Sequence, residues 1–212
     1  MQTLAKPQPG QRLRLSGVDW KTYIGLLKSF GDRPGLRMTY DRGELEIMTV
    51  TFEHENFAEF LGLMVFILTE ELSLPICNGG SVTLKRKIMK RGLEPDKCFW
   101  IANEVKIRGI KRIDLRKHPP PDLALEIDVT RKSLNRMSIY AKLRIPEVWR
   151  LAKNTLTFYA LQANGTYAEI PNSLSFPQVK PDDLLRFLAL CSSTEHNAIV
   201  AQFRTWIRQL KP

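Results

Sequence analysis

Three carboxylates lie close together in the segment Asp122-Leu-Ala-Leu-Glu126-Ile-Asp128. Successive side chains of a β-strand point to opposite faces, so Asp122, Glu126 and Asp128 would share one face and the apolar residues the other. Like charges at this spacing raise one another's pKa values and cost stability unless a cation or basic groups lie between them. A hard divalent cation fits, because Mg²⁺ needs only one or two carboxylates, waters and a substrate phosphate.

Asp96 is a candidate second ligand at the start of another predicted strand, on a face shared with Cys98 and Trp100. If this strand pairs with the 123–129 strand, Asp96 can lie beside Glu126. The alternative is that Asp96 and Asp122, which both follow a proline, serve as turn or cap residues at strand starts. The sequence leaves both interpretations open for each aspartate.

His54 lies on the first turn of a long segment, 52–74, whose apolar residues recur every three or four positions. This spacing predicts an amphipathic helix. A histidine there could act as a proton shuttle or contact a metal-bound water, or it could be a structural group with satisfied hydrogen bonds.

The chain is basic, with 32 lysines and arginines against 22 acidic residues and a net charge of +10. A field of this sign attracts polyanions such as nucleic acid. One basic cluster follows the predicted strand 81–88 and comprises Lys85, Arg86, Lys87, Lys90 and Arg91. These residues would line a groove for a phosphate backbone, with a solvated basic surface as the alternative.

The 212 residues, 43% hydrophobic and 25% charged, are typical of a single globular domain. The three cysteines lack the paired spacing of disulfide or zinc sites, which favours free thiols in a reducing cytoplasm. The N-terminus is polar, and the most apolar run is interrupted by glutamates. We therefore expect a cytoplasmic protein with neither signal peptide nor membrane span.

The apolar periodicity predicts helices at 20–30, 52–74, 133–143, 182–190 and 195–210. Alternating and β-branched runs predict strands at 36–40, 44–48, 81–88, 97–102, 123–129, 148–151 and 155–161, with hairpins at 36–48 and 148–161. We expect an α/β (α+β) fold with a central mixed sheet flanked by helices. Residues 1–212 would form one domain, with a core at 16–190 and a C-terminal helical extension at 191–212.

Three segments carry a resemblance to a known family: Gly92-Leu-Glu-Pro-Asp-Lys-Cys-Phe99, Pro120-Pro-Asp-Leu-Ala-Leu-Glu-Ile-Asp128 and Tyr140-Ala-Lys-Leu-Arg-Ile-Pro-Glu-Val-Trp149. In order and spacing they resemble the Uma-type family of restriction endonuclease-like proteins, once catalogued as domain of unknown function 820. That family belongs to the PD-(D/E)XK nuclease superfamily. The resemblance covers roughly residues 16–190 and includes Gly43-Glu44-Leu45 and His54.

The resemblance implies a restriction endonuclease-like αβββαβ core and hydrolysis of DNA phosphodiester bonds. It also implies a divalent metal, Mg²⁺ or Mn²⁺, held by Asp96 and Glu126, and we expect Asp128 as a further ligand. Members of the superfamily frequently form homodimers, so the resemblance makes a homodimer one expected assembly.

The chain departs from the superfamily pattern at the catalytic lysine. Asp128 stands two residues after Glu126, where the superfamily has lysine, and the resembled family takes its lysine from the next helix, at the position of Arg136. An arginine can hold a phosphate through its fixed fork, but its very high pKa prevents it from acting as a base. Lys142 is a candidate substitute, although six residues further on a helix it would point about 120° away.

Three functions remain open: a metal-dependent DNA endonuclease, a degenerate nuclease fold that binds DNA without cutting it, and an assembly protein. In the last, the carboxylate strand would pair with arginines across a subunit interface. Metal affinity and salt-dependent DNA binding would distinguish them.

Overall fold

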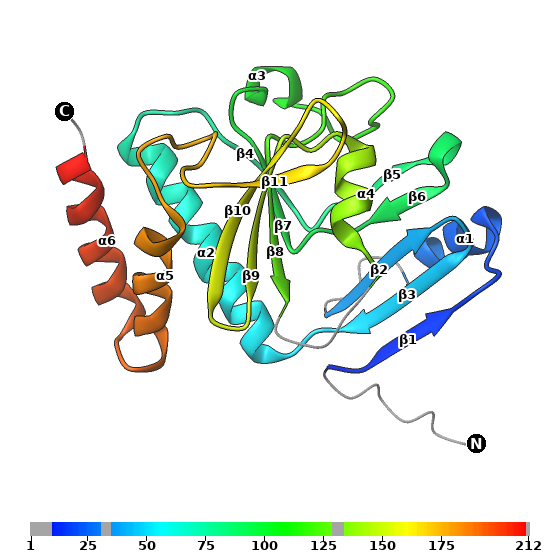
Figure 1. Ribbon diagram of the computed structural model, residues 1–212, viewed down its shortest axis with the longest axis horizontal. Helices are drawn as coiled ribbons and strands as arrows, with labels where there is room; N and C mark the ends of the chain where they lie inside the picture. Colours follow the sequence, from blue (N-terminus) through cyan, green and yellow to red (C-terminus); the bar gives the residue numbers. More distant parts are fainter. Residues whose placement is uncertain (1–9, 31–34, 129–133, 211–212) are drawn as a thin grey trace.

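The computed structural model describes residues 10–30, 35–128 and 134–210. Within these ranges the chain forms two β-sheets and six α-helices (Figure 1). The mixed α/β architecture predicted from the sequence is confirmed.

The larger sheet has six strands in the order β11-β10-β9-β8-β7-β4. The strands are β4 (Cys77–Gly80), β7 (Lys97–Trp100), β8 (Leu123–Asp128), β9 (Glu147–Ala152), β10 (Thr155–Leu161) and β11 (Tyr167–Ile170). β8 and β9 are parallel and the other neighbouring pairs are antiparallel, so the sheet is mixed.

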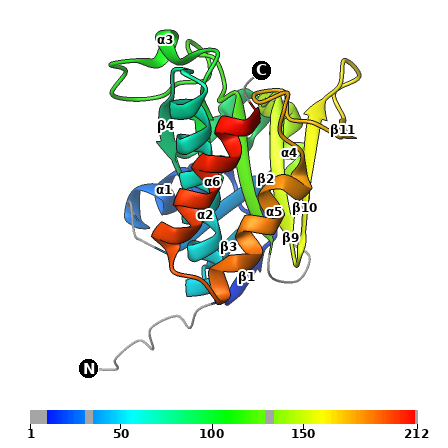
Figure 2. The same cartoon turned by 90° about the vertical axis from the view of Figure 1, so that its left-hand side faces the viewer.

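Helices cover both faces of this sheet. On one face lie α2 (Phe52–Glu71), α5 (Pro181–Ala189) and α6 (His196–Leu210), and their apolar side chains form one cluster with Leu123, Leu125 and Ile127 of β8 (Figure 2). On the other face, α4 (Arg136–Leu143) packs Ile139 and Tyr140 against a cluster that includes Ala124. Strand β8 is thus buried on both faces at the centre of the protein.

The smaller sheet is antiparallel and has five strands in the order β1-β3-β2-β6-β5. They are β1 (Arg12–Leu15), β2 (Leu36–Asp41), β3 (Glu44–Thr49), β5 (Leu84–Arg86) and β6 (Arg91–Leu93). Helix α1 (Trp20–Phe30), which begins where Asp19 Oδ1 accepts from Thr22 N, packs on this sheet and stacks Tyr23 on Tyr40. Leu84 and Leu93 share a cluster with α4, so α4 lies between the two sheets.

Of the smaller sheet, the sequence predicted the β2–β3 hairpin and, within segment 81–88, strand β5, but neither β1 nor β6. Segment 81–88, predicted as one strand, is β5 followed by a 3-10 turn at Lys87–Met89. The turn leads into β6, and β1 is also new. The short helix α3 (Glu104–Ile107) lies in a segment that was expected to be loop. Strands of three or four residues are too short to show a period-two pattern.

Gly79 and Gly80, which lie between the predicted helix 52–74 and the predicted strand 81–88, belong to β4. A Cβ at Gly79 would lie 2.6 Å from Cys98 Sγ and from Trp100 Cζ3, so glycine is needed for β4 to approach β7. The first residue of the predicted 133–143 helix and the last of the predicted 123–129 strand lie outside the described residues.

Of the helices described, none combines the length and apolarity needed to cross a membrane. The three cysteines are free thiols, with Cys98 fully buried and Cys77 and Cys191 half-buried.

Candidate active site

Strands β7 and β8 bring the two principal carboxylates together. Their antiparallel register pairs Lys97 with Leu125, which places Asp96 next to Glu126. The amide of Ile127 donates to Asp96 Oδ2 at 2.7 Å and fixes the aspartate against β8. The strand pairing on which the predicted site depended is therefore confirmed.

Asp96 is almost completely buried, and one of its oxygens lacks a partner. Nε2 of His54, on the first turn of α2, lies 3.3 Å from Oδ2, whereas Oδ1 accepts no hydrogen bond from the described residues. Burial raises the pKa of Asp96, but His54 and the charge of Arg136 outweigh burial and hold the pKa below its usual value. Burial lowers the pKa of His54, but Asp96 outweighs it, so that pKa is raised overall. The two groups thus form a buried pair that favours the charged forms.

Glu126 is also buried, and both of its oxygens have partners from α4. Tyr140 donates its hydroxyl to Oε2 at 2.7 Å, and Nε of Arg136 pairs with Oε1 at 2.5 Å. Burial raises the pKa of Glu126 to about 7, with a further contribution from the charge of Asp96, although Arg136 and Tyr140 oppose the shift. This carboxyl group therefore changes its protonation near neutral pH.

Arg136 braces the site between the two sheets. Its Nη1 donates to Thr39 Oγ1 of β2 at 2.9 Å, and Nη2 donates to the carbonyl of Glu94 at 2.7 Å. With Nε on Glu126, each guanidinium nitrogen has a partner, and only 8% of the residue is exposed. The arginine at the expected lysine position is thus beside Glu126, held as a fixed structural cation.

Asp128, predicted as a further metal ligand, is paired with arginines. Its Oδ2 accepts from Arg150 Nη2 at 2.8 Å, and its Oδ1 lies 3.8 Å from Nη2 of Arg12. Arg12 also lies 3.6 Å from Glu46. The negative charge of Asp128 is therefore compensated by arginines of the protein itself.

Asp122 serves the alternative role that the sequence left open. Its carboxylate accepts hydrogen bonds from the amides of Ile101 and Asn103 and from the Asn103 side chain, at 2.6–2.9 Å. Asp122 therefore caps the turn after β7. Of the three carboxylates that were predicted to share one face of the strand, only Glu126 and Asp128 remain available. Lys142 lies on the same helix as Arg136 but is exposed, so the structure leaves it outside the buried cluster.

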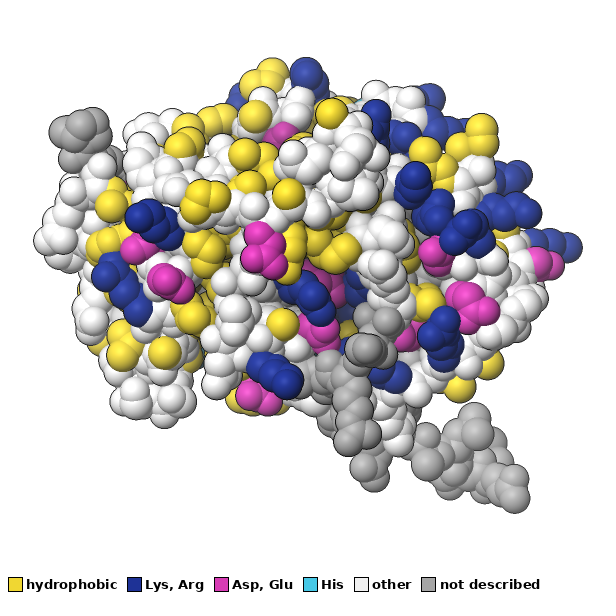
Figure 3. Space-filling model, viewed as in Figure 1, with side chains coloured by type: hydrophobic (Ala, Val, Ile, Leu, Met, Phe, Trp, Pro, Cys, Tyr) yellow, Lys and Arg dark blue, Asp and Glu magenta, His cyan; other side chains and the backbone are white. Residues whose placement is uncertain are grey.

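The predicted basic cluster lies on the β5–β6 hairpin, where Figure 3 shows lysine and arginine side chains gathered on the right of the face. Arg91 is paired with Asp41 at 2.9 Å, and Arg86 donates to the carbonyl of Leu115. Lys87 and Lys90 are exposed and Lys85 is half-buried. The two exposed lysines present the most accessible charge of this cluster.

Tyr140 and Thr39 contribute to the site and were not predicted to do so. Tyr140 lies in the predicted 133–143 helix, where it stands four residues after Arg136 and so on the same helix face. That spacing was the available signal. Nothing local distinguishes Thr39, whose role depends on the packing of the two sheets against α4.

Asp96 and Glu126 are carboxylates of the kind that binds a hard divalent cation, but both oxygens of Glu126 already have partners from α4. Asp96 Oδ1 is a buried anionic oxygen without a donor, and Glu126 lies on the neighbouring strand. Across residues 10–30, 35–128 and 134–210, no group of three or more histidine, cysteine, aspartate or glutamate side chains is placed to hold a metal. Waters and a substrate phosphate would have to complete the coordination, as is usual for Mg²⁺.

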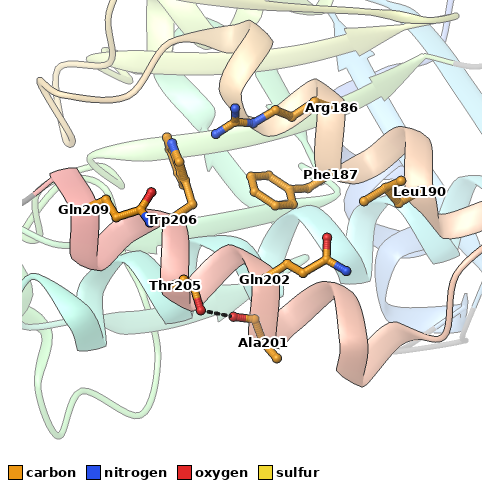
Figure 4. A pocket seen from close by; sticks show the side chains of 8 residues that line it. All are labelled: Arg186, Phe187, Leu190, Ala201, Gln202, Thr205, Trp206 and Gln209. Carbon is orange, nitrogen blue, oxygen red and sulfur yellow. Dashed lines mark hydrogen bonds between the residues drawn. The ribbon is translucent and has the colours of Figure 1, made fainter.

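A groove of about 650 Å³ lies between α5 and α6, across the larger sheet from α4 (Figure 4). The guanidinium of Arg186 lies 4.9 Å from the ring centre of Phe187 and 5.0 Å from that of Trp206. Leucine, glutamine, threonine and alanine side chains complete the lining. It contains none of the acidic residues of the Asp96–Glu126 cluster.

Comparison with known proteins gives a match to one family. The Uma2 family, described as "Putative restriction endonuclease", matches residues 20–190. A solved structure, described as a putative nuclease belonging to DUF820 from Anabaena variabilis, is 15% identical and covers 70% of this chain and 89% of its own, with a TM-score of 0.46. No curated protein matches the chain.

Proposed function

Since the chain belongs to the Uma2 restriction endonuclease family, we propose that this nuclease hydrolyses DNA phosphodiester bonds at the Asp96–Glu126 cluster with a divalent metal ion. Mg²⁺ or Mn²⁺ is the proposed ion, and Asp96 and Glu126 are the residues that would hold it.

The observation that carries this proposal is a pair of buried polar atoms without partners. Oδ1 of Asp96 and Nδ1 of His54 are both buried and have no hydrogen-bond partner among the residues described. Buried polar groups in native proteins are nearly always hydrogen-bonded, so such atoms call for a ligand, an ion or a water. Both belong to groups suited to phosphoryl chemistry, one as an anionic ligand and one as a proton carrier.

Each residue has a distinct role in the proposed reaction. A bound divalent ion would supply positive charge at the phosphate and lower the pKa of a water. Asp96 orients His54, whose raised pKa suits it to carry a proton near neutral pH. Tyr140 and Arg136 position Glu126, and Arg136 acts through that carboxylate because its own pKa is too high for a base.

A second candidate is a nuclease fold that binds DNA without efficient cleavage. It is favoured by the contact between Arg136 and Glu126, because a guanidinium takes the place that a cation would occupy on Oε1. In this case the basic surface would still bind the phosphate backbone. Cleavage and binding must therefore be measured separately.

The experiment is nicking of supercoiled plasmid with Mg²⁺, with Mn²⁺ and with chelator, using the wild type, Glu126→Gln and Glu169→Gln. Glu169 is exposed on β11 and provides the matched control. The proposal predicts metal-dependent nicking that falls at least about 100-fold in Glu126→Gln, since metal-assisted catalysis supplies several kcal/mol. Salt-sensitive DNA binding without nicking by the wild type would favour the second candidate instead.

A further inference from the structure

The tip of the β5–β6 hairpin carries an exposed isoleucine between lysines. Ile88 is the middle residue of the Lys87–Met89 turn, and 93% of it is exposed to solvent. Lys87 and Lys90 on either side are exposed too. Of the large hydrophobic side chains described as exposed, Ile88 is the most exposed, and it stands between two exposed lysines.

The charges of this hairpin are crowded and only partly compensated. Burial lowers the pKa of Lys85, and the nearby charge of Arg112 lowers it further. Arg91 has Asp41 as a partner, but neither Lys87 nor Lys90 makes an ion pair with any described acidic residue. The tip of the hairpin therefore combines two lysines without ion pairs among the described residues and one exposed aliphatic side chain, Ile88.

Duplex DNA offers the complementary chemistry, because its phosphates are anionic and its stacked base pairs are apolar. Proteins that bend DNA commonly insert an aliphatic side chain between two base pairs while lysines and arginines hold the flanking phosphates. We propose that the β5–β6 hairpin is such a wedge, in which Ile88 enters a base step and Lys87 and Lys90 bind the phosphates on either side. This inference rests on the proposed function, and it adds a DNA contact outside the Asp96–Glu126 cluster.

The hairpin is connected to the cluster directly through the backbone. From Ile88 the chain runs through β6 to Asp96, a path of eight residues that spans at most about 27 Å when extended. That length is less than one turn of duplex, which is roughly 34 Å. Arg136, which pairs with Glu126, also donates to the carbonyl of Glu94 on this path. A wedge at Ile88 would thus fix which phosphate, within one helical turn, faces the cluster.

The test uses a duplex of about 25 base pairs with 2-aminopurine at a central TA step, because TA steps unstack easily. Fluorescence reports unstacking, and binding is measured across a range of salt concentrations in chelator so that the duplex stays intact. The variants are Ile88→Ala, Lys87→Ala with Lys90→Ala, and the control Leu174→Ala. Leu174 is 54% exposed and lies between β11 and α5.

We expect the 2-aminopurine fluorescence to rise when the wild type or Leu174→Ala binds the duplex. Ile88→Ala should lose most of that rise, while the dependence of its affinity on salt concentration stays unchanged. The double lysine variant should reduce the slope of log affinity against log salt by about 2, because each phosphate contact contributes roughly 0.9.

Equal fluorescence for Ile88→Ala and the wild type would overturn the wedge while leaving DNA binding and nicking intact. A change of oligomeric state in Ile88→Ala, measured by sedimentation, with wild-type fluorescence would overturn it in favour of self-association. Failure of the wild type to bind DNA at all would instead overturn the proposed function.

Discussion

Glu126 and Arg136 form a buried ion pair that affects both the protonation of the site and the stability of the protein. The carboxylate has a pKa near 7 because burial penalises its charge, and the guanidinium beside it is held by three groups from separate segments. A buried pair of this kind is weak evidence for stability but is strongly destabilising when one partner is removed. The sequence predicted both residues at the site, but it could not show that the arginine's donors would all be engaged, since Thr39 lies 97 residues away.

The raised pKa of Glu126 predicts a specific pH dependence of stability. A carboxyl group whose pKa rises from 4.5 to about 7 on folding stabilises the protein fully below pH 4.5 and loses that contribution as pH rises through 7. Between pH 5 and 8 the unfolding free energy of the metal-free wild type should fall by roughly 2–3 kcal/mol relative to Glu126→Gln. Urea unfolding at both pH values in chelator measures this difference. A constant difference between the two proteins would contradict the assigned shift.

Replacement of Arg136 by methionine should be far more costly than replacement of an exposed arginine. Arg136→Met leaves the charges of Glu126 and Asp96 buried without their cation, at a cost of about 3–5 kcal/mol. Arg116 is an exposed arginine paired with Asp114, so Arg116→Met should leave the stability close to that of the wild type. Denaturant midpoints give the comparison, and similar losses in the two variants would show that Arg136 does not brace the site.

At the scale of elements, strands whose apolar side chains alternate were predictable, whereas β1 and β6 were not. Strand β8 was predicted over all of its described residues, Leu123–Asp128, because apolar side chains alternate along it. Strands β1 and β6 have three or four residues each, and they pair with β3 and β2, which are distant in the chain. Asp96 and Asp122 show the same limit at the site. Both follow a proline before a strand, and only the tertiary structure distinguishes the one beside Glu126 from the one that caps a turn.

Gly92 is required for α1 to pack on the smaller sheet. A Cβ there would lie 2.5 Å from the hydroxyl oxygen of Tyr23 and 3.0 Å from Cβ of Lys85. Gly92→Ala should destabilise the protein by about 1–3 kcal/mol through overpacking. Gly25 in α1 has open space at this position, so Gly25→Ala should instead stabilise it by roughly 0.5–1 kcal/mol. Thermal unfolding of both variants tests this packing, and a neutral Gly92→Ala would contradict it.

At the scale of the whole molecule, one apolar cluster joins α2, the larger sheet, α5 and α6. Ile199, Phe203 and Ile207 of α6 are buried in it. Residues 191–212 were expected from the sequence as an extension, and we propose that their described part, 191–210, folds together with the core as one unit. The β5–β6 hairpin and the Asp96–Glu126 cluster would then belong to one rigid unit, to which the duplex binds.

Phe203→Ala should therefore lower the stability of the entire protein. Loss of a buried phenylalanine costs about 3–5 kcal/mol, and the unfolding curve should remain a single transition at a lower denaturant concentration. Circular dichroism and tryptophan fluorescence, followed together, report this. An early separate transition in the tryptophan fluorescence, to which Trp206 of α6 contributes, with no such step in the circular dichroism of the core, would show that α6 unfolds independently.

The measurement that tests the central claim most directly compares plasmid nicking by Asp96→Asn and Asp122→Asn, the two aspartates that follow prolines. Asp96 lies beside Glu126 with a free carboxylate oxygen, whereas Asp122 is saturated by the turn that it caps. We expect Asp96→Asn to lose at least about 100-fold in metal-dependent nicking and Asp122→Asn, where it remains folded, to retain near wild-type activity. Retention of activity in Asp96→Asn would contradict the assignment of the hydrolytic centre.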